Sequence, residues 1–133
     1  MPDPWIKRSM LATDVGFLAY WLATAVQLIP PYPERVLVDW NWSFLVLDVF
    51  ASVLGLMALW CLRTGAPGAE QLTLLSLALT HAAGLNALVF WSLRCEFDVM
   101  WWAPNLWLTI FPVVAALAVL RPRLTRDAAA AIR

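Results

Sequence analysis

The sequence predicts an all-α fold, an integral membrane four-helix bundle of up-down topology that occupies residues 1–133 as a single transmembrane domain. Of the 133 residues, 62% are hydrophobic and only 14% are charged, which is about half the charged share of a soluble domain. Four apolar windows are long enough for a helix to cross about 30 Å of hydrocarbon, which takes about 20 residues. Transmembrane β-strands are excluded, because they would show short alternating segments in place of these unbroken runs.

The expected helices are separated by residues that start or end helices. Asp3 followed by Pro4 is typical of a helix N-cap and first turn, which places the start of the first helix ahead of its apolar part. Asn41 or Ser43 is expected to cap the second helix. Prolines end the first helix and a tight turn joins the second and third, at Pro30, Pro31 and Pro33 and at Gly65, Pro67 and Gly68. The expected boundaries are 10–29, 44–62, 72–93 and 101–120.

The distribution of lysine and arginine indicates that both termini are cytoplasmic. In this orientation the basic residues on the cytoplasmic side outnumber the outer ones, as the positive-inside rule requires. The cytoplasmic set is Lys7, Arg8, Arg63, Arg121, Arg123, Arg126 and Arg133, and the outer set is Arg35 and Arg94. The same orientation gathers tryptophans at the outer interface, namely Trp40, Trp42, Trp91, Trp101 and Trp102. An aromatic belt that fixes the depth of the protein explains them, and a ligand cage is the alternative.

The two cysteines and the single histidine give no sign of metal or redox chemistry. Cys61 and Cys95 are expected at opposite ends of the bundle, far beyond the about 7 Å between Cα atoms that a disulfide tolerates. The sequence contains no CxxC motif and no histidine group with zinc spacing. We therefore expect no cofactor, no metal, no catalytic residue and no nucleic-acid partner.

Polar side chains inside the expected spans are the most informative residues, because an acid at membrane depth is costly unless it is protonated, paired or hydrated. Each helix contributes one such group at a similar depth in the outer half, and these are Gln27, Asp48, Asn86 and Asn105. We expect them to line a water-accessible pocket, floored by His81 and walled by Trp42, Trp91 and Trp107. The Asp48 carboxylate is expected to face the interior, within hydrogen-bonding reach of Asn86 or Asn105.

A purely structural interpretation of these polar residues stays open. Amides, hydroxyls and a neutral histidine hydrogen-bond between helices in membranes and hold them together. Arg94 could reach Asp48 as a structural ion pair. Small residues share helix faces that favour close packing, at Ser52, Gly55 and Ala58 and at Ser76, Thr80 and Gly84. Asp14, in the inner part of the first helix, has no assigned role.

Three stretches of the chain resemble a known family. TDVGFLAYW (13–21), DWNWSFLVLDV (39–49) and GLNALVFWSLRCEFDVMWWAPNLWL (84–108) are similar to the YvaD-like family. These are small bacterial membrane proteins of unknown function with four predicted spans. The resemblance implies a bacterial cytoplasmic membrane as the location, but it implies no activity and no site residue.

Three functions remain as hypotheses. The first is binding or transport of a small polar or cationic ligand in the outer pocket, where tryptophan rings would attract a cation. The second is an accessory membrane protein without a ligand, whose polar residues pack its helices, a second copy or a partner membrane protein. The third, an enzyme using His81 with Asp14 or Asp48, is disfavoured because no nucleophile accompanies them.

Overall fold

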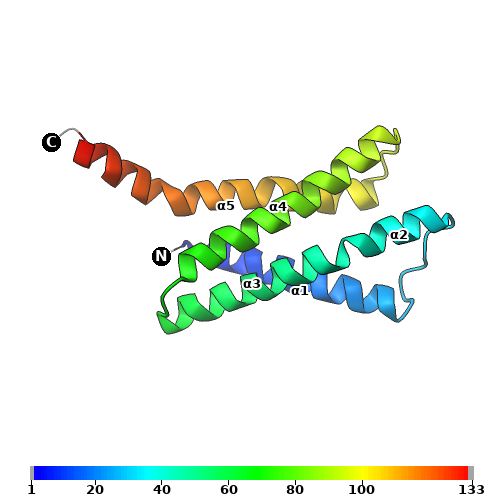
Figure 1. The fold of residues 1–133 in the computed structure, drawn as a ribbon, viewed down its shortest axis with the longest axis horizontal. Coiled ribbons are helices and arrows are strands. Elements are labelled where there is room, and N and C mark those ends of the chain that lie inside the picture. The colour runs from blue at the N-terminus through cyan, green and yellow to red at the C-terminus, as the bar shows by residue number, and fades with distance from the viewer. Residues whose placement is uncertain (1, 132–133) are drawn as a thin grey trace.

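The computed structural model describes residues 2–131, with side chains as far as Arg121, and its described residues are helical apart from short connections. The helices are α1 (Pro4–Ala25), α2 (Arg35–Ser43), α3 (Leu45–Thr64), α4 (Ala69–Leu93) and α5 (Val99–Ala131). α2 continues almost in line into α3, so the helices form four rods that run alternately up and down (Figure 1). Both ends of the chain lie at the same end of the bundle (Figure 1). The predicted all-α, up-down architecture is confirmed.

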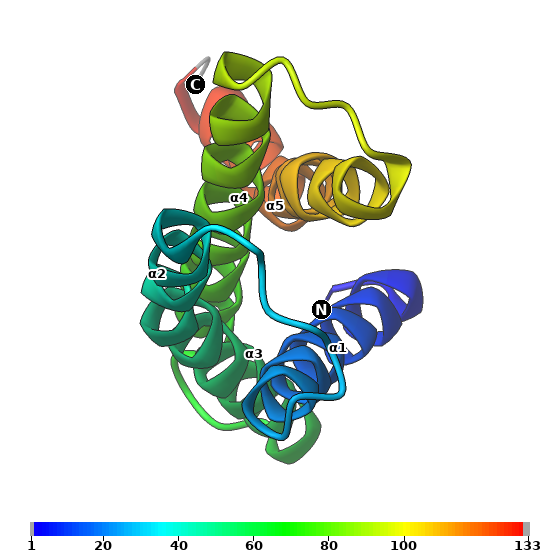
Figure 2. The same ribbon diagram turned by 90° about the vertical axis from the view of Figure 1, so that its right-hand side faces the viewer.

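The rods pack in the order α1, α3, α4, α5 along a curved row, so that α1 and α5 lie on the same side of α3 and α4 and face each other (Figure 2). Small residues allow the close approaches. Gly55 of α3 lies against the Asp14 carboxyl group of α1. A Cβ atom at Gly84 of α4 would stand 2.7 Å from Cβ of Leu108 in α5. Ser76 of α4 donates a hydrogen bond of 3.0 Å to the Ala51 carbonyl of α3, so the predicted small-residue faces do form helix contacts.

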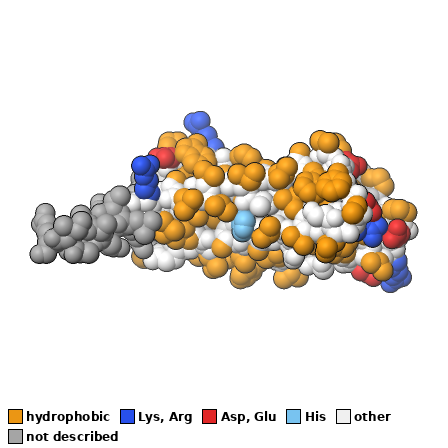
Figure 3. All heavy atoms as spheres, turned by 90° about the horizontal axis from the view of Figure 1, so that it is seen from above, with side chains coloured by type: hydrophobic (Ala, Val, Ile, Leu, Met, Phe, Trp, Pro, Cys, Tyr) orange, Lys and Arg blue, Asp and Glu red, His pale blue; other side chains and the backbone are white. Residues whose placement is uncertain are grey.

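Three helical stretches of the described chain are long and apolar enough to cross a membrane: α2 with α3, α4, and α5 as far as Arg121. α1 is not among them, because Lys7, Arg8 and Asp14 lower its hydropathy. Large apolar side chains cover much of the outer surface between the two ends (Figure 3). Val46, Leu93 and Leu117 are among those that are most exposed.

Several of the predicted helix boundaries differ from those of the structure. The first helix does begin at Pro4 after Asp3, but it ends at Ala25 and not at Ile29. Gln27 takes a left-handed conformation with φ of 59°, and the amides of Gln27 and Leu28 bond back to the carbonyls of Thr24 and Ala23. This is the Schellman ending of a helix, with glutamine at the position where glycine is usual.

The segment before the second predicted helix is itself helical. α2 occupies residues 35–43, so Asn41 and Ser43 lie inside a helix and do not cap one. The fourth helix extends past residue 120 to Ala131. Three arginines that contributed to the predicted orientation cannot be placed. The structure does not describe the side chains of Arg123 and Arg126 or any part of Arg133.

Cys61 and Cys95 are free thiols, as predicted. Cys61 is buried in the last turn of α3, and Cys95 is exposed directly after α4. Because α3 and α4 are antiparallel neighbours, the two thiols lie at opposite ends of the bundle.

Candidate functional site

A cavity of about 680 Å³ lies between α1 and α5, and residues of α3 and α4 line it as well. Aromatic rings from every rod dominate its wall. They are Phe17, Tyr20, Trp21, Tyr32, Trp40, Phe44, Trp91, Trp101 and Trp107. Few polar side chains interrupt this aromatic surface, and Asp48 is the only charged one among the lining residues that the structure describes. Cavities of this size and composition are suited to small, mainly apolar molecules.

Asp48 is fixed by one hydrogen bond and leaves one oxygen without a partner. It stands in the first turn of α3 and is only 5% exposed. Trp21 of α1 donates from Nε1 to Oδ2 of Asp48 over 3.0 Å. The other oxygen, Oδ1, is buried and makes no hydrogen bond. A buried acceptor without a partner is costly, and a bound molecule that supplied a donor or a positive charge would relieve that cost.

Apart from the Tyr32 hydroxyl, which is buried without a partner, the other polar side chains of the cavity already have partners. Thr13 accepts a hydrogen bond of 3.0 Å from Nε1 of Trp107, which joins α1 to α5. Asn41 accepts one of 2.9 Å from the hydroxyl of Tyr20. Asn105 donates to the Trp101 carbonyl within its own helix. Asp48 is therefore the polar group with most capacity left for a ligand.

The structure brings together four of the eight residues that the sequence assigned to a site. Asp48, Asn105, Trp91 and Trp107 line the cavity, whereas Gln27, His81, Asn86 and Trp42 do not. Asp48 faces the interior as expected, but neither Asn86 nor Asn105 hydrogen-bonds to it in the described part of the chain. Gln27 is exposed in the turn that ends α1, and Trp42 is exposed while its ring lies 5.4 Å from that of Trp21.

Asn86 and His81 do not line the cavity because they lie on other faces of α4 than the one that borders it. Ala83, Ala87 and Trp91 repeat every fourth residue and form the face that lines it. Asn86 points about 100° away from that face and is exposed. His81 turns toward α5, where its Nδ1 lies 2.8 Å from the Thr109 carbonyl. A carbonyl only accepts, so Nδ1 carries a proton and His81 joins two helices, which matches the structural interpretation.

Several lining residues were missed by the sequence argument. Phe17, Tyr20 and Trp21 lie on the first helix, from which the sequence analysis had chosen Gln27 as the lining residue. The available signal was spacing, since Asp14, Phe17 and Trp21 recur at helical intervals and are all buried. Trp21 is the important omission because it holds Asp48.

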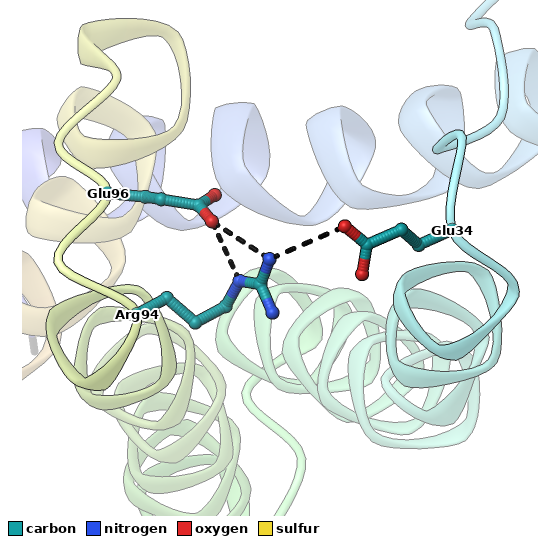
Figure 4. Close-up of polar contacts among 3 residues, drawn as sticks. All are labelled: Glu34, Arg94 and Glu96. Atoms are coloured by element: carbon teal, nitrogen blue, oxygen red, sulfur yellow. Dashed lines mark hydrogen bonds and ion pairs between the residues drawn. The ribbon is translucent and has the colours of Figure 1, made fainter.

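At the end of the bundle that carries the α4–α5 connection, Arg94 bridges two loops (Figure 4). Its Nη2 lies 2.9 Å from Glu96 and 3.8 Å from Glu34, and its Nε also donates to Glu96. Arg94 is therefore paired with glutamates and not with Asp48. These three residues border a smaller cavity of about 260 Å³, which shares Tyr32, Trp91 and Trp101 with the larger one.

Tyr32 forms part of the partition between the two cavities. Its ring centroid is 6.0 Å from that of Trp91 and 5.6 Å from that of Trp101. The hydroxyl is buried and has no hydrogen-bond partner. Burial raises the pKa of the Tyr32 phenol above its usual range, so this group is uncharged at physiological pH.

Fold and cavity together define a small helical-bundle protein with apolar helices and one acid in an aromatic cavity. Residues 6–126 match the family of unknown function DUF5360. The chain is also 38% identical over 115 residues to the uncharacterized protein YvaD of Bacillus subtilis (strain 168), a match that covers 82% of this chain and 86% of that protein. The chain therefore belongs to this family, as its resemblance to YvaD-like proteins predicted. No solved structure matches it.

Proposed function

We propose that the chain is a multi-pass protein of the bacterial cytoplasmic membrane, crossing it four times with both termini in the cytoplasm. Three apolar helical stretches support this proposal, and so do the apolar side chains exposed around the bundle. α1 is the fourth span although its hydropathy is lower. Its acid, Asp14, is 2% exposed and hidden against α3, while Lys7 and Arg8 lie near its start, where they reach the membrane surface.

We further propose that the cavity binds a small, largely apolar organic cation, with Asp48 as its counter-ion. The observation that carries the proposal is the buried, unpartnered Oδ1 of Asp48 in a wall of aromatic rings. The face of an aromatic ring attracts a cation, and Trp21 already orients the carboxylate. An anion would find no positive charge, since none of the described lining residues is basic. A strongly polar neutral ligand would find few free hydrogen-bonding groups in the cavity. Of the two ligand classes expected from the sequence, polar and cationic, we therefore propose the cationic one.

Binding can be tested with a pair of probes that differ only in charge. Benzyltrimethylammonium is an aromatic cation of suitable size, and neopentylbenzene is its uncharged carbon isostere. We expect the purified protein in lipid nanodiscs to bind the cation saturably, measured through tryptophan fluorescence. The isostere is expected to bind at least about tenfold more weakly, since it lacks the attraction to Asp48 and to the ring faces.

Two variants make the test specific. Asp48→Asn keeps the shape of the side chain and removes its charge, so it should lose cation binding while the bundle stays folded. Asp39→Asn removes an acid that is exposed on α2 and paired with Arg35, and this variant should bind the cation like the wild type. Equal binding by all three proteins, or none by the wild type, would favour an accessory protein without a ligand.

A further inference from the structure

Two acids, Asp14 and Asp48, are buried between α1 and α3 in different surroundings. Asp48 lines the cavity, whereas Asp14 does not. We propose that Asp48 carries a proton when the cavity is empty and exchanges it for the bound cation, while Asp14 keeps its proton throughout. This inference rests on the proposed function, since it concerns how the same site is loaded and emptied.

The surroundings of Asp48 do not support a bare negative charge. One donor, Nε1 of Trp21, reaches the carboxylate, and Oδ1 has no partner. The groups lining the cavity from the packed elements are neutral or acidic: Tyr20 on α1, Asn41 on α2, Asn105 on α5 and Tyr32 in the loop, with Ala83, Ala87 and Trp91 on α4. The basic side chains near this end of the bundle have acidic partners elsewhere, since Arg94 after α4 is bound to Glu34 and Glu96, and Arg35 of α2 is paired with Asp39. A proton is the simplest neutraliser of the empty site.

Within the part of the chain that the structure describes, no hydrogen bond reaches Asp14, whereas Asp48 has one. It is 2% exposed, and its Oδ2 is buried without a hydrogen bond. Gly55 packs directly against the carboxyl group, so no cation fits between α3 and this side of Asp14. Asp14 and Trp21 are two turns apart on α1, facing Gly55 and Asp48 of α3. Two ionised acids about 10 Å apart in this apolar interface would also repel each other.

The exchange balances without a further reactant. The O–H bond of the Asp48 carboxyl group breaks, the proton passes to water, and the carboxylate forms an ion pair with the organic cation. No covalent bond to the cation is made. Because binding releases a proton, the apparent affinity must rise with pH, up to the pH at which the empty site is itself ionised.

The direct test counts protons. Benzyltrimethylammonium is added to the full-length protein in weakly buffered nanodiscs that contain a pH-sensitive dye. We expect about one proton released per cation bound, and an apparent Kd that falls about tenfold per pH unit across part of the range from about pH 5 to about pH 9. Asp14→Asn is the matched control, since it removes the other buried carboxyl group of the same helix pair, and this variant should release the same number of protons per cation.

Infrared difference spectra give a second measurement. The carbonyl stretch of a protonated carboxylic acid should disappear when the cation binds to the wild type or to Asp14→Asn, and Asp48→Asn should show no such change. Saturable binding without proton release and without pH dependence would overturn the exchange and leave the binding site standing. If Asp14→Asn released no proton on binding, the exchanged proton would belong to Asp14, and its assignment to Asp48 would be wrong. Absence of any binding would overturn the proposed function together with this inference.

Discussion

Gly55 is the residue that allows an acid to be buried between α1 and α3. A methyl group on Gly55 would collide with the carboxyl group of Asp14. Gly16, on the same face of the bundle as the cavity, has nothing within 4 Å of the position that a Cβ would take. Packing therefore requires glycine at position 55 and does not require it at position 16.

We predict opposite effects for the same substitution at these two glycines. Gly55→Ala should lower the free energy of unfolding by about 1–3 kcal/mol, because the added methyl overpacks the interface. Gly16→Ala should raise it by up to about 1 kcal/mol, because alanine favours the helix. Thermal melting in one detergent compares both with the wild type. Adding Asp14→Ala should rescue Gly55→Ala, and a Gly55→Ala protein as stable as the wild type would contradict the packing account.

At the scale of the helices, the sequence predicted how many rods there are. Apolar length and proline positions carry that information directly. Which face of a helix points toward the cavity depends on how the neighbouring helices pack against it. A single sequence does not contain this information in a form that can be read directly. Asn86 and Asp48 illustrate this, since the sequence placed both at the level of the expected pocket, but only Asp48 lines the cavity. The Trp21 contact was missed for the same reason.

The end of α1 was misplaced because a glutamine occupies a position where glycine usually signals the end of a helix. Gln27 holds a left-handed conformation, which costs a residue with a Cβ about 1 kcal/mol. Gln27→Gly should therefore stabilise the protein by about 1 kcal/mol in thermal or denaturant unfolding. Gln27→Ala should give no such gain, because alanine also carries a Cβ. If Gln27→Gly weakened cation binding at unchanged stability, the side chain would belong to the site after all.

For the molecule as a whole, the orientation in the membrane can be tested with the cysteines that it already has. Cys95 is exposed and Cys61 is buried, at opposite ends. A membrane-impermeant maleimide added to intact cells should label Cys95, because the proposed orientation places it outside. Cys95→Ser should abolish the labelling, while Cys61→Ser should leave it unchanged. Labelling that appears only after the cells are opened would reverse the orientation.

The central claim, a cation site at Asp48 within the aromatic cavity, is tested most directly by covalent mapping. Photolysis of (4-azidobenzyl)trimethylammonium with the protein in nanodiscs, followed by mass spectrometry of its peptides, locates the bound probe. We predict labels on lining residues close to Asp48, such as Trp21, Phe44 or Trp107, which benzyltrimethylammonium suppresses and Asp48→Asn eliminates. Labels confined to outward residues such as Asn86 or Trp60, unaffected by competitor and by Asp48→Asn, would contradict it.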